Sequence, residues 1–233
     1  METQKTYRIP TLKRLPSYLR ELRNLRERGK RYVASPALAE ALGVDAITAR
    51  KDMEMLGASG MPGVGFDVQA LIDSIEDCLG CKNSSEAFLA GTGDFGKALL
   101  GYGGFGEYGL KIVAAFDHDP IPEGKSIHGI PVFGYSHFRH YAERLNIRLG
   151  ILCTGEDEAQ KTAELMVESG ILAIWNFTAH TLRLPPGIIR QRVNLAGDLA
   201  VLSVKLAERL RSGDTGTLPR SAGESAAEGK KKG

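Results

Sequence analysis

Apolar residues recur at helical spacing through the first part of the chain. Five leucines fall three or four positions apart between residues 10 and 31, which predicts a helix with one buried face, and Gly29 is suited to end it. The leucines of this face are Leu12, Leu15, Leu19, Leu22 and Leu25.

The next segment predicts two short helices joined by a tight turn. Ser35 can cap a helix that has Pro36 at its first position and closes at Gly43. Asp45 can cap a second helix that runs to about Leu56. A helix, a turn with glycine and another helix make the layout of a helix-turn-helix.

A wing and a connecting helix are expected next, and from about Ser85 the pattern changes to alternating strands and helices. The sequence MPGVGFDV has the glycines of a wing hairpin, and residues 68–80 predict a connecting helix. Beyond them, strands are expected at 86–91, 111–117, 149–154 and 171–177, and helices at 94–105 and 156–169. This alternation predicts an α/β fold with a doubly wound parallel sheet.

The chain therefore divides into four expected segments. Residues 1–80 form a winged helix-turn-helix domain, 81–193 a Rossmann nucleotide-binding domain, 194–211 one amphipathic helix, and 212–233 a tail. The tail is small and polar and ends in three lysines and a glycine, which is typical of a disordered segment.

Composition adds a candidate partner and excludes others. Among the 233 residues the net charge is only +2, but residues 8–31 hold nine Lys or Arg against two acids. A basic block on a helix-turn-helix domain indicates binding to DNA. No apolar run reaches the roughly 20 residues needed to cross a bilayer, and the N-terminus lacks a signal peptide's apolar core. We therefore expect a cytoplasmic protein with no membrane partner.

A glycine-rich loop marks the expected nucleotide site. Gly91 allows a tight turn, Gly93 lets the backbone approach a pyrophosphate, and Gly96 lets helix and strand pack closely. Asp117 ends the next expected strand, where a carboxylate bonds ribose hydroxyls and repels a 2′-phosphate, so NAD(H) is the expected cofactor. The alternative is a glycine-rich turn followed by an unrelated acid. The residues expected to line the site are Gly91, Thr92, Gly93, Asp94, Phe95, Gly96, Asp117, His118 and Asp119.

Neither catalysis nor a metal is expected. Hydride transfer needs a positioned acid or base, and His180 is the one histidine whose place suits it; the chain has no second domain for a substrate. The Cys78-Leu79-Gly80-Cys81 motif lacks the second pair that zinc requires. A plain linker is favoured there, and a reversible thiol pair is the alternative.

Motifs in a fixed order across both expected domains carry a family resemblance. They are TLKRLPSYLREL, ARKD, GVGFDV, GTGDFGKALLGYGGF, KIVAAFDHDP, GIPVF, LGILCT, EAQKTAELMVESGI and IWNFT. Over roughly residues 8–207 the chain resembles the Rex family of redox-sensing transcriptional repressors. The resemblance implies a homodimer with a swapped C-terminal helix, whose winged helices bind palindromic operator DNA. It also implies that NADH releases the DNA and that NAD⁺ permits binding.

The resemblance assigns roles to individual positions. It implies DNA contacts for Lys13, Arg14, Thr48, Arg50 and Lys51. It places Tyr102 and Thr154 at the cofactor and Phe105 near the dimer contact. It implies that Arg20 and the residue at position 194 take part in the switch between the two states, because an acid at that position is thought to exchange between the arginine and Tyr102.

Several positions depart from the family pattern. Glu54 puts a negative charge on the recognition helix, and Pro62 stands where the wing carries a basic residue. Gly155 and Glu156 replace the last two residues of a Thr-Val-Pro motif at the cofactor, and Asn194 replaces the acid of the switch. A Rex paralogue with altered or weak DNA binding is therefore a second hypothesis, and an NAD-dependent oxidoreductase with a DNA-like appendage is a third.

Overall fold

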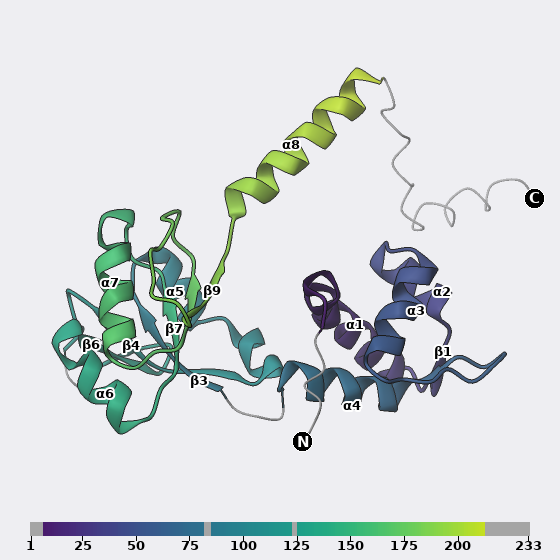
Figure 1. Ribbon diagram of the computed structural model, residues 1–233, viewed down its shortest axis with the longest axis horizontal. Helices are drawn as coiled ribbons and strands as arrows, with labels where there is room; N and C mark the ends of the chain where they lie inside the picture. Colours follow the sequence, from purple (N-terminus) through teal and green to yellow (C-terminus); the bar gives the residue numbers. More distant parts are fainter. Residues whose placement is uncertain (1–6, 82–84, 123–124, 213–233) are drawn as a thin grey trace, which may run out of the picture. The chain divides into compact units, whose positions relative to one another are not determined.

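The computed structural model describes residues 7–81, 85–122 and 125–212. The chain divides into two compact units, and the boundary between them in the sequence falls between Gln191 and Arg192. The first unit holds a helical N-terminal part and a seven-stranded sheet, and the second holds one long helix (Figure 1).

The N-terminal part is a three-helix core with a small two-stranded sheet and a connecting helix. Its elements are α1 (Ile9–Glu27), β1 (Tyr32–Val33), α2 (Ser35–Leu42), α3 (Ala46–Met55), β2 (Phe66–Asp67) and α4 (Val68–Leu79). The leucines predicted to form the buried face include Leu15, Leu19 and Leu22, which are fully buried in one core with Met53 and Ile75. This order of elements, with β1 antiparallel to β2, is that of a winged helix-turn-helix.

Two helix ends differ from the sequence prediction. The first helix stops at Glu27, because Gly29 adopts a left-handed conformation with φ of 73°. Ser35 does not cap α2 but lies in its first turn, and Ala34 precedes it without a side-chain cap. Asp45 caps α3 as predicted, accepting a hydrogen bond from the Thr48 amide at 2.8 Å.

The wing is short and tightly held. Met61 and Gly65 exchange backbone hydrogen bonds of 2.8 and 2.9 Å. Gly65 has φ of 106°, and a Cβ atom there would overlap the Val33 carbonyl oxygen, so this position requires glycine. Phe66 anchors the base of the wing in the core.

The sheet has the order β5-β6-β4-β3-β7-β8-β9, and the pairs along β6-β4-β3-β7-β8 are parallel. Its strands are β3 (Ser85–Ala90), β4 (Leu110–Asp117), β5 (Ser126–Ile127), β6 (Ile130–Gly134), β7 (Leu149–Leu152), β8 (Ala173–Asn176) and β9 (Ile189–Arg192). Its helices are α5 (Asp94–Leu100), η1 (Gly103–Tyr108), η2 (Tyr135–His137), α6 (Phe138–Arg144) and α7 (Glu156–Glu168). The doubly wound prediction is confirmed. The connections leave β3 toward β4 on one side and toward β7 on the other, so the carboxyl end of β3 is the point at which sheets of this kind have their ligand-binding crevice.

Two features of this part were not predicted. The helix expected at 94–105 ends at Leu100 and continues as the separate 3₁₀ helix η1, because Gly101 and Gly103 interrupt it. The strands β5, β6 and β9 and the helix α6 were missed. The elements β5, β9 and α6 are short and carry polar residues that hide the periodicity, whereas the apolar β6 was noted only as the GIPVF motif.

The second unit contains α8 (Leu195–Arg211), at the predicted position. None of its residues is buried, and the apolar side of the helix is exposed, with Leu199 and Leu202 each more than 60% accessible. Of the tail predicted at 212–233, all but Ser212 lies outside the described residues. Within the described ranges, no helix is both long and apolar enough to cross a membrane.

Candidate functional site

The glycine loop between β3 and α5 lies at the crevice. Gly91 has φ of 94°, and a Cβ atom there would lie 2.6 Å from the Thr154 nitrogen, so this loop packs directly on the chain that leaves β7. A Cβ atom on Gly96 would overlap the Gly91 carbonyl oxygen. Gly93 has no neighbouring atom within 4 Å of a Cβ position. Two glycines therefore close the loop, while the third leaves open space beside the backbone.

Asp117 is fixed by the same loop. One of its carboxylate oxygens accepts hydrogen bonds from the Thr92 amide at 2.5 Å and the Thr92 hydroxyl at 2.7 Å, and the other accepts one from the Asp119 amide at 3.3 Å. Burial alone would raise the pKa of Asp117, but the hydrogen bonds from Thr92 hold that pKa below its ordinary value. The acid is therefore charged and immobile, as a ribose-binding carboxylate requires.

The side chain of His118, which follows Asp117, contacts two residues that the sequence analysis did not single out. His118 Nε2 lies 3.0 Å from Glu158 Oε1 on α7, and its ring meets the edge of Tyr135 at 4.7 Å between centroids. Burial, and then the charge of Asp117, raise the pKa of Tyr135. Glu158 and Tyr135 follow β7 and β6 at the carboxyl edge of the sheet, so locating β6 from the sequence would have found Tyr135.

Thr154 has an unused polar group in the crevice. Its hydroxyl oxygen is buried and makes no hydrogen bond within the described residues. A buried hydroxyl normally has a partner, and a bound molecule with polar atoms at this point would supply one. The open side of Gly93, the fixed charge of Asp117 and the Thr154 hydroxyl together fit a dinucleotide.

Aromatic rings connect this loop to η1. Between ring centroids, Phe95 in the first turn of α5 lies 5.4 Å from Phe177, and Phe177 lies 4.6 Å from Trp175. Trp175 in turn lies 5.6 Å from Phe105 in η1. Tyr102 then packs edge-on against Phe105 at 4.8 Å and remains more than half exposed. Phe105 therefore packs between Tyr102 and Trp175, and its expected place near a dimer contact stays a prediction.

The segment η1 also contacts the N-terminal part. Arg23 of α1 lies 3.0 Å from Glu76 of α4 and 3.4 Å from Glu107 of η1. Tyr108 packs against the N-terminal hydrophobic core. These contacts join η1, which Tyr102 immediately precedes, to the winged helix. Sequence reasoning missed the Arg23–Glu107 pair because its partners are 84 positions apart.

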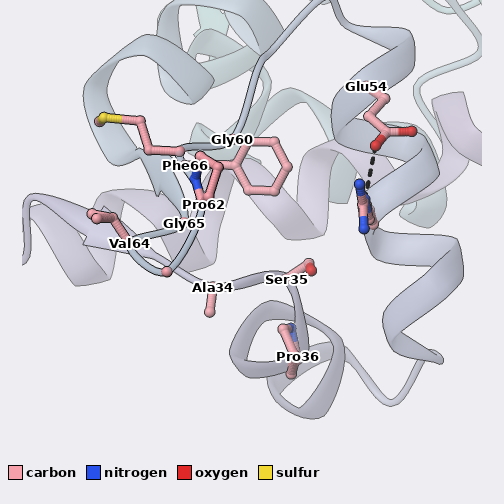
Figure 2. Close-up of a pocket in the computed structure, with 12 residues that line it drawn as sticks. Ala34, Ser35, Pro36, Glu54, Gly60, Pro62, Val64, Gly65 and Phe66 are labelled. Carbon is pink, nitrogen blue, oxygen red and sulfur yellow. Dashed lines mark hydrogen bonds and ion pairs between the residues drawn. The ribbon is translucent and has the colours of Figure 1, made fainter.

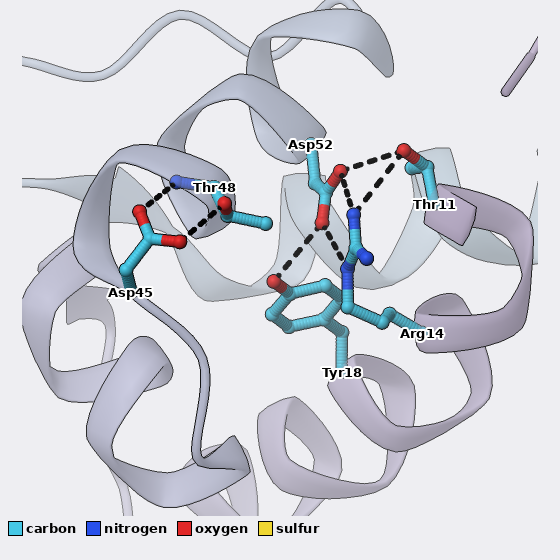
Figure 3. Close-up of polar contacts among 6 residues, drawn as sticks. All are labelled: Thr11, Arg14, Tyr18, Asp45, Thr48 and Asp52. Atoms are coloured by element: carbon cyan, nitrogen blue, oxygen red, sulfur yellow. Dashed lines mark hydrogen bonds and ion pairs between the residues drawn. The ribbon is translucent and has the colours of Figure 1, made fainter.

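A buried carboxylate organises the face of the winged helix. Asp52 accepts hydrogen bonds from the Thr11 hydroxyl at 2.7 Å, from Arg14 Nε and Nη2 at 2.7 and 2.9 Å, and from the Tyr18 hydroxyl at 3.1 Å (Figure 3). Burial raises the pKa of Tyr18 to about 12, so its hydroxyl stays protonated and donates. Arg14, expected at DNA phosphates, is thus held by Asp52 while its side chain stays partly exposed, and its contact with DNA stays a prediction.

The remaining residues expected at DNA lie on α3 and at the start of α1. Lys13 and Lys51 are exposed, as a contact with DNA requires. Thr48 donates its hydroxyl to Asp45 at 2.5 Å and so completes the helix cap. Arg50 Nε lies 2.8 Å from Glu54 Oε1 on the same helix. These two residues line one pocket with the wing residues Pro62 and Val64 (Figure 2).

Comparisons with known proteins agree with both parts of this geometry. The family model described as "Putative DNA-binding protein N-terminus" matches residues 9–54, and the model described as "CoA binding domain" matches residues 82–180. The Redox-sensing transcriptional repressor Rex of Bacteroides fragilis is 40% identical over 197 residues, which are 84% of this chain and 90% of that protein. The chain belongs to the Rex family.

Solved Rex structures share the fold. The crystal structure of RSP in complex with β-NAD⁺ and operator DNA matches with a TM-score of 0.80 and 30% identity, and covers 91% of this chain and all of that one. The RSP complex with β-NADH matches with a TM-score of 0.78 and 30% identity, over 90% of this chain and 99% of that one. The winged-helix and Rossmann architecture predicted from the sequence is that of Rex structures.

The two residues implied in the Rex switch lie in different units of this chain. Arg20 is exposed on α1, and Asn194 caps α8 by accepting a hydrogen bond from the Gly197 amide at 3.0 Å. Their interaction stays a prediction. No group of three or more potential metal ligands occurs within the described ranges, and Cys78, Cys81 and Cys153 form no disulfide there.

Proposed function

We propose that this chain is a redox-sensing transcriptional repressor that binds operator DNA and leaves it when NADH binds. The observation that carries the proposal is a dinucleotide crevice in the same chain as a basic winged helix, with η1 in contact with both. The neighbouring structures of RSP with β-NAD⁺ and operator DNA and with β-NADH support both ligands. The same relatives are repressors, so the oxidoreductase hypothesis has no support.

The proposed nucleotide contacts follow from the crevice. The loop Gly91–Gly96 would hold the pyrophosphate at its open Gly93 side, Asp117 the adenosine ribose, and Thr154 a polar group of the cofactor. The fixed negative charge of Asp117 would repel a 2′-phosphate, which favours NAD(H) over NADP(H). The nicotinamide ring, which carries the redox state, would then approach Tyr102.

Release of DNA requires that the two ligands prefer different arrangements. NADH can shift the equilibrium only if it binds the arrangement that does not bind DNA more tightly, and DNA must then weaken NADH binding by the same factor. We propose that η1 is the moving element, because Glu107 and Tyr108 lie on it and Tyr102 immediately precedes it.

We also propose a homodimer that acts on palindromic DNA in the cytoplasm. The exposed leucines of α8 form an apolar side of a kind that commonly marks a protein interface. A second chain would bury it, and the swapped arrangement implied by the family resemblance would place α8 of one chain against the other. A twofold dimer presents its two recognition helices about one helical turn of DNA apart.

A titration of a labelled Rex-type palindrome tests this proposal. Fluorescence anisotropy of the full chain is expected to show tight binding with NAD⁺ and loss of binding with NADH. DNA binding that is equal in both nucleotide states would contradict the redox response.

The divergent paralogue remains the alternative. It is favoured by the Arg50–Glu54 pair and by Pro62 in the wing, since each reduces the positive charge available to phosphates. In the same titration this alternative predicts normal NADH binding with weak or absent DNA binding in every state.

Restoring an acid at position 194 is expected to strengthen the switch. A charged hydrogen bond is roughly twice as strong as a neutral one, so Asn194→Asp should increase the ratio of DNA affinities with NAD⁺ and NADH by about fivefold. The ratio is measured by the same anisotropy titration, with Asn194→Ala as the comparison. An unchanged ratio in Asn194→Asp would show that this position does not take part.

A further inference from the structure

One stripe of α3 is free of contacts with the core. Ile47, Arg50, Lys51 and Glu54 are spaced three and four positions apart and are all exposed, whereas Ala49, Asp52 and Met53 face inward. In a helix-turn-helix this outward stripe of the second helix is the surface that enters the major groove. Glu54 therefore lies among the groups that would meet base edges.

Arg50 and Glu54 form an oriented pair on this stripe. Arg50 Nε is 2.8 Å from Glu54 Oε1, and within the described residues the two terminal nitrogens of Arg50 make no other hydrogen bond (Figure 2). The carboxylate thus holds the guanidinium while leaving its forked end available. The second carboxylate oxygen of Glu54 likewise accepts no hydrogen bond from the described residues.

A carboxylate in the major groove needs a hydrogen-bond donor. Guanine and thymine present acceptors there, which would repel it, and adenine presents one donor beside an acceptor. Cytosine presents its N4 amino group with no acceptor on the same edge, and guanine offers O6 and N7 to an arginine. The pair on α3 is therefore complementary to guanine and cytosine together.

We propose that Glu54 is a base-reading residue of this protein, selecting cytosine in the operator while its partner Arg50 contacts guanine. This inference rests on the proposed function, because it concerns the same DNA surface. It assigns a role to the acid other than simple repulsion of phosphate. The wing beside the pair offers Met61, Pro62 and Val64, which carry no charge, so sequence discrimination depends on the α3 stripe.

Selection from a library of palindromes with randomised half-sites tests the inference. The full chain with NAD⁺ is expected to prefer cytosine at one position of each half-site by about fivefold or more. Glu54→Ala should bind all sequences more tightly and lose this preference to within about twofold. Glu54→Gln should shift the preference toward adenine, because an amide can donate to N7 and accept from N6.

A matched control separates base reading from charge. Glu40 is exposed on α2, outside the stripe, and Glu40→Gln and Glu40→Ala remove the same charge. These variants should leave the base preference unchanged. If Glu54→Ala binds every sequence more tightly by the same factor and keeps the base preference of the unmodified chain, Glu54 only repels phosphates. That result would overturn the inference. An unmodified chain that binds no palindrome with either nucleotide would overturn the proposed function as well.

Discussion

Replacing Asp52 by asparagine is expected to lower the free energy of unfolding of the N-terminal part by about 2–4 kcal/mol. The side chain of Asp52 is only 4% exposed and holds Arg14, Thr11 and Tyr18, so its loss leaves a partly buried guanidinium without its partner. The loss of stability should be smaller than for a completely buried ion pair, because the Arg14 side chain is 27% exposed. DNA binding should fall as well, since Asp52 fixes α3 against α1.

The same carboxylate makes stability depend on pH. Burial alone would raise the pKa of Asp52, but hydrogen bonds from Arg14 and Thr11 outweigh it and lower that pKa. A group whose folded pKa is lowered stabilises the fold above its ordinary pKa. Its contribution is lost as the pH falls through the folded pKa, which lies below the ordinary pKa of an aspartate. Asp52→Asn should therefore show a smaller loss of stability on acidification than the unmodified chain.

Denaturant unfolding of the full chain measures both effects. Far-UV circular dichroism reports all helices, whereas the fluorescence of Trp175, the single tryptophan, reports the sheet. The expected result is an earlier transition by circular dichroism and an unchanged one by fluorescence. Asp73→Asn on the exposed side of α4 is the matched control and should change stability by less than about 0.5 kcal/mol. A control that loses as much stability as Asp52→Asn would count against the network.

The second large effect is expected at Gly96. In Gly96→Ala the new methyl group would overlap the Gly91 carbonyl oxygen, so the loop must move away from its place beside Thr154. Overpacking of this kind costs about 1–3 kcal/mol, and we expect NADH affinity to fall by about 30-fold. Operator binding should then become insensitive to NADH at concentrations that release the unmodified chain from DNA.

Gly93→Ala is the comparison, because it is the same change in the same loop. No protein atom lies within 4 Å of the added methyl group, so the melting temperature should stay as it is while NADH binding weakens. Isothermal titration calorimetry with NADH and a thermal melt of each variant provide the measurements. Full NADH affinity in Gly96→Ala would contradict the assigned role of this loop, and so would a large loss of stability in Gly93→Ala.

Local signals in the sequence located much of the fold and the nucleotide loop. The strands β3, β4, β7 and β8 were found because each is a continuous apolar run, and Asp45 was found as a helix cap because capping involves residues three positions apart. The nucleotide loop was located in the same way, because the spacing of its glycines and of Asp117 is visible along the chain. The two-residue strand β5 carries too little apolar pattern to be found. The apolar β6 was noted only as part of a motif, and Tyr135, which follows it, was missed with it.

The sequence alone determined which residues could bind a dinucleotide and where a recognition helix begins, since both depend on short spacings along the chain. Only the tertiary structure decided what the charged residues do. Arg14 pairs with Asp52 across 38 positions, and Arg23 reaches Glu107 across 84. A side chain of one basic type can bind a phosphate, a base or a buried acid, and the choice depends on which groups the folded chain brings within hydrogen-bonding distance.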